Sequence, residues 1–164
     1  MFIPNCNKWM RCLVTAFGVG LGTLPALAHD GVHITDAYLR SAGSVGGSAA
    51  AFMTIENHQI EDERLLSARS DLAARVELHT HREEANGVML MLEVPGGFVI
   101  PARGMHALAR GGDHVMFFGL TRPLKDGDIV TVTLTFALSG EVVVQVPVDN
   151  AREPDSAAGD HTGH

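Results

Sequence analysis

Hydrophobic and polar residues alternate in short runs along most of the chain. From His33 onward these runs are separated by Gly, Asp, Pro and Asn, and no stretch keeps the 3.6-residue period of a helix. A period of two is typical of strands that bury one face. The expected strands lie at residues 33–40, 49–57, 62–68, 73–82, 88–94, 98–100, 104–110, 114–120, 128–136 and 141–148. The pattern therefore predicts an all-β protein, either a sandwich or a Greek-key barrel.

The first 28 residues have the pattern of an export signal. Lys8 and Arg11 precede an apolar run that ends near Pro25, and the small-x-small sequence at 26–28 is typical of a cleavage site. The run is short for the roughly 20 residues of a membrane-spanning helix. We therefore expect residues 1–28 to be a cleaved signal peptide, His29 to become the first residue, and the product to be periplasmic without membrane insertion.

Removal of that segment changes the chemistry available to the chain. The remaining 136 residues carry 10 basic and 19 acidic side chains, a net charge of −9, and no cysteine, because Cys6 and Cys12 are lost. Disulfides, thiol redox chemistry and the thiolate ligand of a blue-copper centre are excluded. Lipid attachment is not indicated, since neither cysteine follows the apolar run. The acidic charge also argues against a nucleic-acid partner.

The mature chain divides into one β domain and a tail. Residues 29–149 suffice for one packed core. Residues 150–164 contain no large apolar side chain, so we expect a flexible tail. His161 and His164 in the tail, and His29 at the new terminus, are candidates for a weaker copper(II) site, because nitrogen donors suit that ion. The alternative is that these histidines are solvated and bind nothing.

Three pairs of candidate metal donors occur at strand period between residues 76 and 120. In each pair one residue separates the two donors, so that both project from the same face of a strand. The pairs are His79 and His81, Met89 and Met91, and His114 and Met116. Methionine is also a common filler of cores, and strand histidines are often plain surface residues. Three ordered pairs in a mature chain with five methionines favour a metal site.

The segment 83–87 is predicted to be the loop of a hairpin that joins the first two pairs. If the hairpin is symmetric about Ala85, His79 lies opposite Met91 and His81 lies opposite Met89. Cross-strand neighbours have Cβ atoms about 5 Å apart, close enough for an imidazole and a thioether to bind one ion.

The combination of donors indicates the metal. Thioether sulfur is soft and uncharged, and together with imidazole it selects copper(I) over zinc, calcium or magnesium. A haem is not expected, because no Cys-x-x-Cys-His motif is present. The predicted copper(I) ligands are His79, Met91, His114 and Met116, with His81 and Met89 as secondary ligands.

These residues resemble the motif of the periplasmic copper chaperones called PCuAC. In that family a His, a following position that is often Met, ten residues and a Met precede a His-x-Met. Here His79 is followed by Thr80, ten residues and Met91, and the further gap to His114 is one residue longer than in the family. The turn at residues 95–97 can absorb the extra residue.

The resemblance extends over residues 33–148. It includes the segments 51–57, 119–128 and 140–148. It implies a cupredoxin-like β-barrel that carries copper(I) toward the assembly of cytochrome c oxidase. The expected acceptor is an oxidase subunit or a thiol-bearing assembly factor, and we expect the chain to be a monomer. The alternative is a copper-sequestering protein without a dedicated acceptor. A copper enzyme built on His29 is not expected, because only Tyr38 among the mature residues could supply a phenol or indole to a substrate face.

Overall fold

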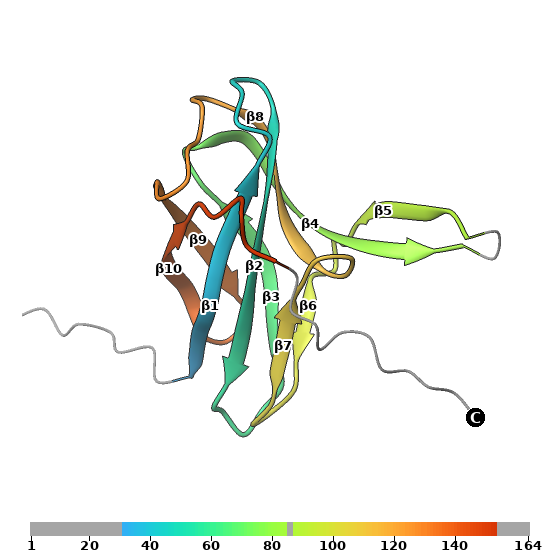
Figure 1. Ribbon diagram of the computed structural model, residues 1–164. Coiled ribbons are helices and arrows are strands. Elements are labelled where there is room, and N and C mark those ends of the chain that lie inside the picture. The colour runs from blue at the N-terminus through green and yellow to red at the C-terminus, as the bar shows by residue number, and fades with distance from the viewer. Residues whose placement is uncertain (1–30, 85–86, 154–164) are drawn as a thin grey trace, which may run out of the picture.

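Two antiparallel β-sheets packed face to face make up the computed structural model, which describes residues 31–84 and 87–153 (Figure 1). The strands are β1 (Val32–Ser41), β2 (Ser48–Asn57), β3 (Glu63–Arg69), β4 (Ala73–Glu83), β5 (Met89–Glu93), β6 (Phe98–Ile100), β7 (Met105–Leu108), β8 (His114–Leu120), β9 (Ile129–Phe136) and β10 (Gly140–Pro147). The predicted all-β sandwich is confirmed. Each of the ten predicted strands is present, with ends within two residues of those expected.

The order of the strands places the donor pairs at one side of one sheet. The larger sheet has the order β1-β2-β8-β4-β5, and β7 also pairs with β2. The smaller sheet has the order β10-β9-β3-β6. A parallel bridge between Leu39 and Val148 joins the two sheets at the β1 side. At the other side, β5 and the end of β4 extend away from the sandwich (Figure 1).

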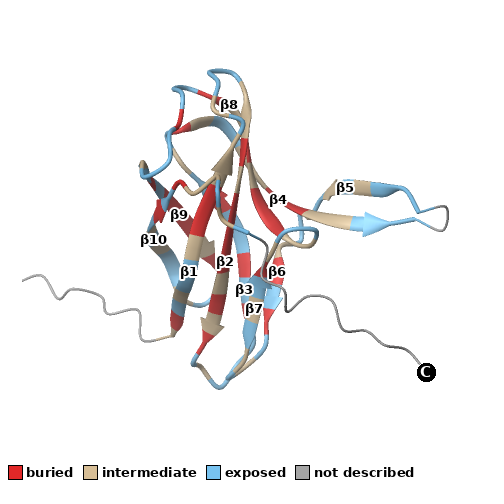
Figure 2. Cartoon of the chain, in the orientation of Figure 1, coloured by how far each residue is buried: buried red, intermediate tan, exposed pale blue. Residues whose placement is uncertain are grey.

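The core lies between the sheets and uses alternate residues of each strand. Phe117 and Val115 of β8 are fully buried in it, as are Ile55 of β2 and Leu134 of β9 (Figure 2). Because successive residues of a strand face opposite ways, the residues between them point away from the core. In β8 the residues that point away from the core include His114 and Met116. The core therefore turns the donor pairs toward the outer face of the larger sheet.

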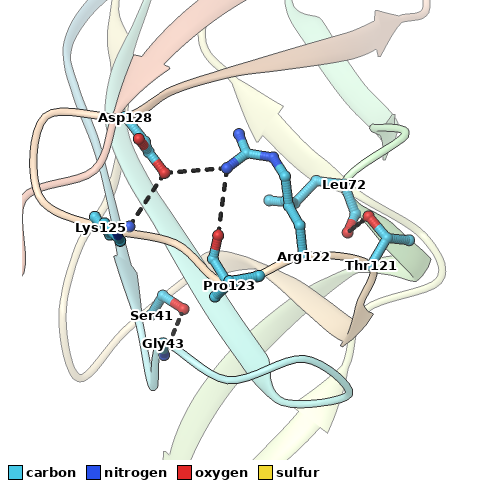
Figure 3. A network of polar contacts seen from close by, with 8 residues as sticks. All are labelled: Ser41, Gly43, Leu72, Thr121, Arg122, Pro123, Lys125 and Asp128. Carbon is cyan, nitrogen blue, oxygen red and sulfur yellow. Dashed lines mark hydrogen bonds and ion pairs between the residues drawn. The ribbon is translucent and has the colours of Figure 1, made fainter.

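Polar side chains fix the connections. Glu63 is 1% exposed, and its carboxylate accepts hydrogen bonds from the backbone N–H groups of Arg64, Leu138 and Ser139. In the β8–β9 connection, Asp128 accepts from Arg122 Nη1 at 3.0 Å and from the Lys125 N–H at 3.1 Å (Figure 3). These contacts hold the two ends of β9 in place.

The last described residues return to β1. The Asn150 side chain accepts a hydrogen bond from the Ser41 N–H at 2.9 Å. The Arg152 guanidinium lies 4.3 Å from the centre of the Tyr38 ring and pairs with Asp36. The expected tail begins at 150, but its first residues are held against the sheet by these polar contacts. Within the described ranges, no helix is long and apolar enough to cross a bilayer.

Candidate metal site

Strand β4 lies between β8 and β5, and its register decides which donors meet. On one side His79 lies directly opposite His114. On the other side His81 lies opposite Met91, and Glu83 lies opposite Met89. The predicted pairings of His79 with Met91 and of His81 with Met89 are therefore wrong.

The position of the hairpin turn explains this shift. The turn closes through a hydrogen bond from the Gly87 N–H to the Glu84 carbonyl at 2.9 Å, and Gly87 has a φ of +78°. Glycine adopts this conformation without steric cost, so it fixes where the chain reverses. Moving the centre of the hairpin one residue later moves every rung of the ladder by two residues. The faces of the strands stay the same, but the partners change.

Four of the candidate donors line one pocket of about 350 Å³ on the outer face of the larger sheet. They are His81, Met91, His114 and Met116. The other wall comes from residues 40–42 and 48–50 at the facing ends of β1 and β2. Ala50 lies opposite Met116 in the sheet, and its small side chain leaves room above the thioether. A larger hollow of about 420 Å³ near Thr121 contains none of the predicted donors.

His114 is the deepest donor, at 1% exposed. Its Nδ1 lies 3.0 Å from the Gly112 carbonyl. Because a carbonyl oxygen only accepts, Nδ1 carries the proton and Nε2 keeps a lone pair. Burial, together with the nearby imidazoles of His81 and His79, lowers the pKa of His114, although the hydrogen bond to Gly112 opposes this shift. The neutral imidazole that binds metals is therefore favoured.

His79 lies beside the pocket rather than on its wall. It is 7% exposed, and its ring centre is 6.0 Å from that of His114. Its Nε2 contacts Glu77 Oε2 at 2.8 Å, whereas its Nδ1 is buried and has no hydrogen-bond partner among the described residues. The structure thus brings His79 to the site, adjacent to the deepest donor.

His81 and the methionines of β5 lie nearer the surface. The His81 ring stacks on that of His114 with centres 5.0 Å apart, and its buried Nδ1 also lacks a partner in the described chain. Met91 is 46% exposed at the pocket. Met89 is exposed, faces Glu83 and does not line the pocket. The remaining secondary candidates, His29, His161 and His164, lie outside the described residues.

The arrangement indicates a mixed set of donors. Among residues 31–84 and 87–153, no group of three His, Cys, Asp or Glu side chains could hold a metal ion. The pocket is lined by two thioethers beside two imidazoles, so a metal held there would meet both kinds of donor, and this combination favours a soft ion.

Sequence reasoning did not identify Glu77 or Arg75 as part of the site. Both precede His79 at strand period, so the spacing places them on the same face of β4. Arg75 Nε lies 2.6 Å from Glu77 Oε1, which links the two charges to the imidazole. A charged pair two and four residues before a candidate ligand, on the same face, is the signal that could have found them.

A family model described as "Putative lipoprotein LpqE-like" matches residues 32–148. The chain belongs to the LpqE-like family. Among curated proteins, it is 37% identical over 124 residues to "Putative lipoprotein Lxx21020" of Leifsonia xyli subsp. xyli, a match that covers 76% of this chain and 73% of that protein.

Solved structures of PCuAC domains share the fold of this LpqE-like protein. The copper-bound PCuAC domain from PmoF2 superposes with a TM-score of 0.58 at 22% identity, covering 72% of this chain and 92% of that domain. The copper(I)-bound solution structure of DR1885 from Deinococcus radiodurans gives a TM-score of 0.53 at 32% identity, covering 82% and 85%. The predicted cupredoxin-like fold and the resemblance to PCuAC are confirmed.

Proposed function

We propose that this protein is a periplasmic copper chaperone that binds copper(I) on the outer face of its larger sheet and passes it to a cuproprotein such as cytochrome c oxidase. The observation that carries the proposal is a pocket lined by two imidazoles and two thioethers, with a third imidazole, that of His79, beside it and directly opposite His114. A neutral set of nitrogen and sulfur donors matches copper(I) and excludes hard ions. The copper-bound PCuAC domain and copper(I)-bound DR1885 support the same cargo.

The proposed ligands are His79, Met91, His114 and Met116, with His81 as an exchange ligand at the pocket wall. His79 and His114 lie opposite each other on the neighbouring strands β4 and β8, and both are buried. Buried ligands of this kind suit stable binding of the ion. His81 and Met91 form the next rung outward. This gradient from buried to exposed donors gives an incoming acceptor sulfur access from the Met91 side.

Export is part of the proposal. The pattern of residues 1–28 and the lipoprotein names of the relatives both support an exported protein. A lipid anchor is not proposed for this chain, because Cys6 and Cys12 both precede the apolar run. Amino-terminal sequencing of protein from the periplasmic fraction is expected to begin at His29, and a product that retains residues 1–28 would contradict this part.

X-ray absorption of the copper(I)-loaded protein tests the site. We expect mixed nitrogen and sulfur ligation, with one copper per chain. His79→Gln should lower the affinity for copper(I) more than His81→Gln, because we propose that His79 is a permanent ligand and that His81 binds the ion only during exchange. Ligation by nitrogen and oxygen alone would overturn the site, and the reverse order of the two variants would exchange the roles of the two histidines.

Transfer kinetics separate a chaperone from a copper store, the second candidate. A His/Met site lacks the negative thiolates that would trap copper(I), so a dithiol acceptor should remove the metal by ligand exchange. The transfer rate to a reduced dithiol copper site of an oxidase subunit should rise with the acceptor concentration. A rate equal to spontaneous release into a chelator would favour sequestration.

A further inference from the structure

We propose that Glu77 is a positioning residue of the metal site, which holds the proton of His79 on Nε2 and thereby leaves Nδ1 as the nitrogen that binds copper(I). This inference rests on the proposed function and adds a residue that none of the donor pairs contains. It is carried by a chain of contacts along the outer face of β4.

The contact between Glu77 and His79 decides the tautomer. Glu77 Oε2 lies 2.8 Å from His79 Nε2. An ionised carboxylate only accepts hydrogen bonds, so Nε2 must carry a proton. A neutral imidazole has one N–H, and Nδ1 of His79 therefore presents a lone pair.

The carboxylate is itself held in place. Its second oxygen, Oε1, lies 2.6 Å from Arg75 Nε, and the Arg75 guanidinium lies 4.6 Å from the centre of the Phe118 ring. The same Phe118 ring lies 5.6 Å from the His79 ring. Arg75, Glu77 and His79 follow one another at strand period, so the contacts require no distortion of the backbone. Glu77 is only 17% exposed, which limits its freedom to rotate away.

The lone pair on Nδ1 accepts no hydrogen bond in the described structure, which leaves it available to a ligand. Nδ1 of His79 is buried and unpartnered. A buried acceptor without a partner is costly, so it calls for an explanation. On the adjacent strand, directly opposite, His114 has the complementary arrangement, with Nδ1 bonded to the Gly112 carbonyl and the lone pair therefore on Nε2. In both rings one nitrogen is fixed by an acceptor of the chain, which is how metal-binding histidines are oriented.

The test compares Glu77→Gln with a matched control, Glu141→Gln. Glu141 is exposed and pairs with Arg69 at 2.8 Å on the smaller sheet, so the control removes a similar charge far from the site. Glutamine keeps the shape of the side chain but removes the charge that fixes the proton. We expect Glu77→Gln to weaken copper(I) binding about 10–100-fold in a competition with a chelator. Glu141→Gln should leave the affinity unchanged.

The tautomer is measured without copper. Ring ¹⁵N shifts of the metal-free protein are recorded at a pH of about 8.5, roughly two units above the ordinary pKa of histidine. In the wild type we expect the proton of His79 on Nε2, and in Glu77→Gln a mixture of tautomers. A proton on Nδ1 in the wild type would overturn the inference. An unchanged tautomer together with unchanged affinity in Glu77→Gln would also overturn it.

A double variant separates positioning from general loss of structure. In a His79→Gln background, Glu77→Gln should cause little further loss of copper(I) affinity, because its effect passes through His79. A full further loss would mean that Glu77 acts by another route and would overturn the inference. A wild type with the expected tautomer that binds no copper(I) would instead overturn the proposed function and leave the orienting contact intact.

Discussion

Met91 on β5 lies directly opposite His81 on β4, and this rung is the outermost one that contributes donors to the pocket. The Met91 side chain is nearly half exposed, whereas Met116 on β8 is partly covered. Neither thioether belongs to the core cluster of the sandwich. Their chemistry can therefore be changed without opening the core.

Met91→Leu and Met116→Leu should separate copper binding from folding. Leucine nearly conserves the volume of methionine, so each variant should cost less than about 1.5 kcal/mol in the free energy of unfolding. Copper(I) affinity should fall in both, because leucine has no donor atom. Denaturant titration and chelator competition measure the two effects. Variants that unfold yet keep their affinity would show that the methionines are structural. Met53→Leu, in the buried core, serves as a control that should retain copper(I) binding.

Gly97→Ala should destabilise the fold more than Gly140→Ala. Both glycines have positive φ, +69° and +71°. At Gly97 an added Cβ would lie 2.0 Å from the Leu65 carbonyl oxygen, whereas at Gly140 it would meet nothing within 4 Å. The conformational penalty is about 1–2 kcal/mol at each position. Overpacking against the backbone should add more than about 1 kcal/mol at Gly97. Equal thermal stabilities of the two variants would contradict the close approach.

Glu63 should make stability depend on pH below about 4.5. Burial alone would raise its pKa, but the hydrogen bonds from Arg64, Leu138 and Ser139 outweigh it, so the folded pKa lies below the ordinary value of 4.5. A lowered folded pKa stabilises the native state above the unfolded pKa, and this contribution is lost as the pH falls through the folded pKa.

The matching variant is Glu63→Gln, with exposed Glu61→Gln as its control. At pH 7 we expect Glu63→Gln to cost about 2 kcal/mol or more, because the backbone N–H groups of Arg64, Leu138 and Ser139 lose a charged acceptor. The gap in unfolding free energy between wild type and Glu63→Gln should narrow as the pH falls from about 4.5 toward 3. A gap that stays constant over that range would mean that Glu63 is not ionised in the folded protein.

Deleting residues 154–164 should leave folding and copper(I) binding intact. The deletion keeps Asn150 and Arg152, which make a hydrogen bond and an ion pair with β1. It removes His161 and His164, so any second, copper(II) equivalent that depends on them should disappear. Copper titrations of the full and shortened chains decide this. Equal copper(II) stoichiometry would show that the two histidines do not bind it.

The alternation of residues predicts the strands because each strand buries one face. Val115 and Phe117 point into the core. His114 and Met116 alternate with them along β8, so they share the outer face of the sheet. The register of the β4–β5 hairpin could not be predicted in the same way. It depends on which residue of the loop takes a positive φ, and the sequence alone did not single out Gly87 for that position. The pairing of His81 with Met91 follows from that register.

The proposed role of Glu77 also depends on more than spacing. Its carboxylate faces His79 because Arg75 holds the other oxygen, and such a chain of contacts becomes visible only when rotamers and distances are known. In contrast, the donor types were readable at once, since Met and His at strand period are chemically specific. Sequence therefore predicts which elements carry the candidate site, and the structure shows which groups contact the imidazoles of His79 and His114.

Strand β5 is short, pairs only with β4 among the described strands, and contains no buried residue. Opening of this edge requires breaking one ladder of hydrogen bonds while the sandwich behind it stays closed, so it belongs to the least stable part of the fold. Met91 can then swing away while His114, enclosed at the centre of the sheet, keeps its place. A metal ion bound here would lose its donors in a fixed order, from the edge of the sheet toward its centre. The site would form again in the reverse order.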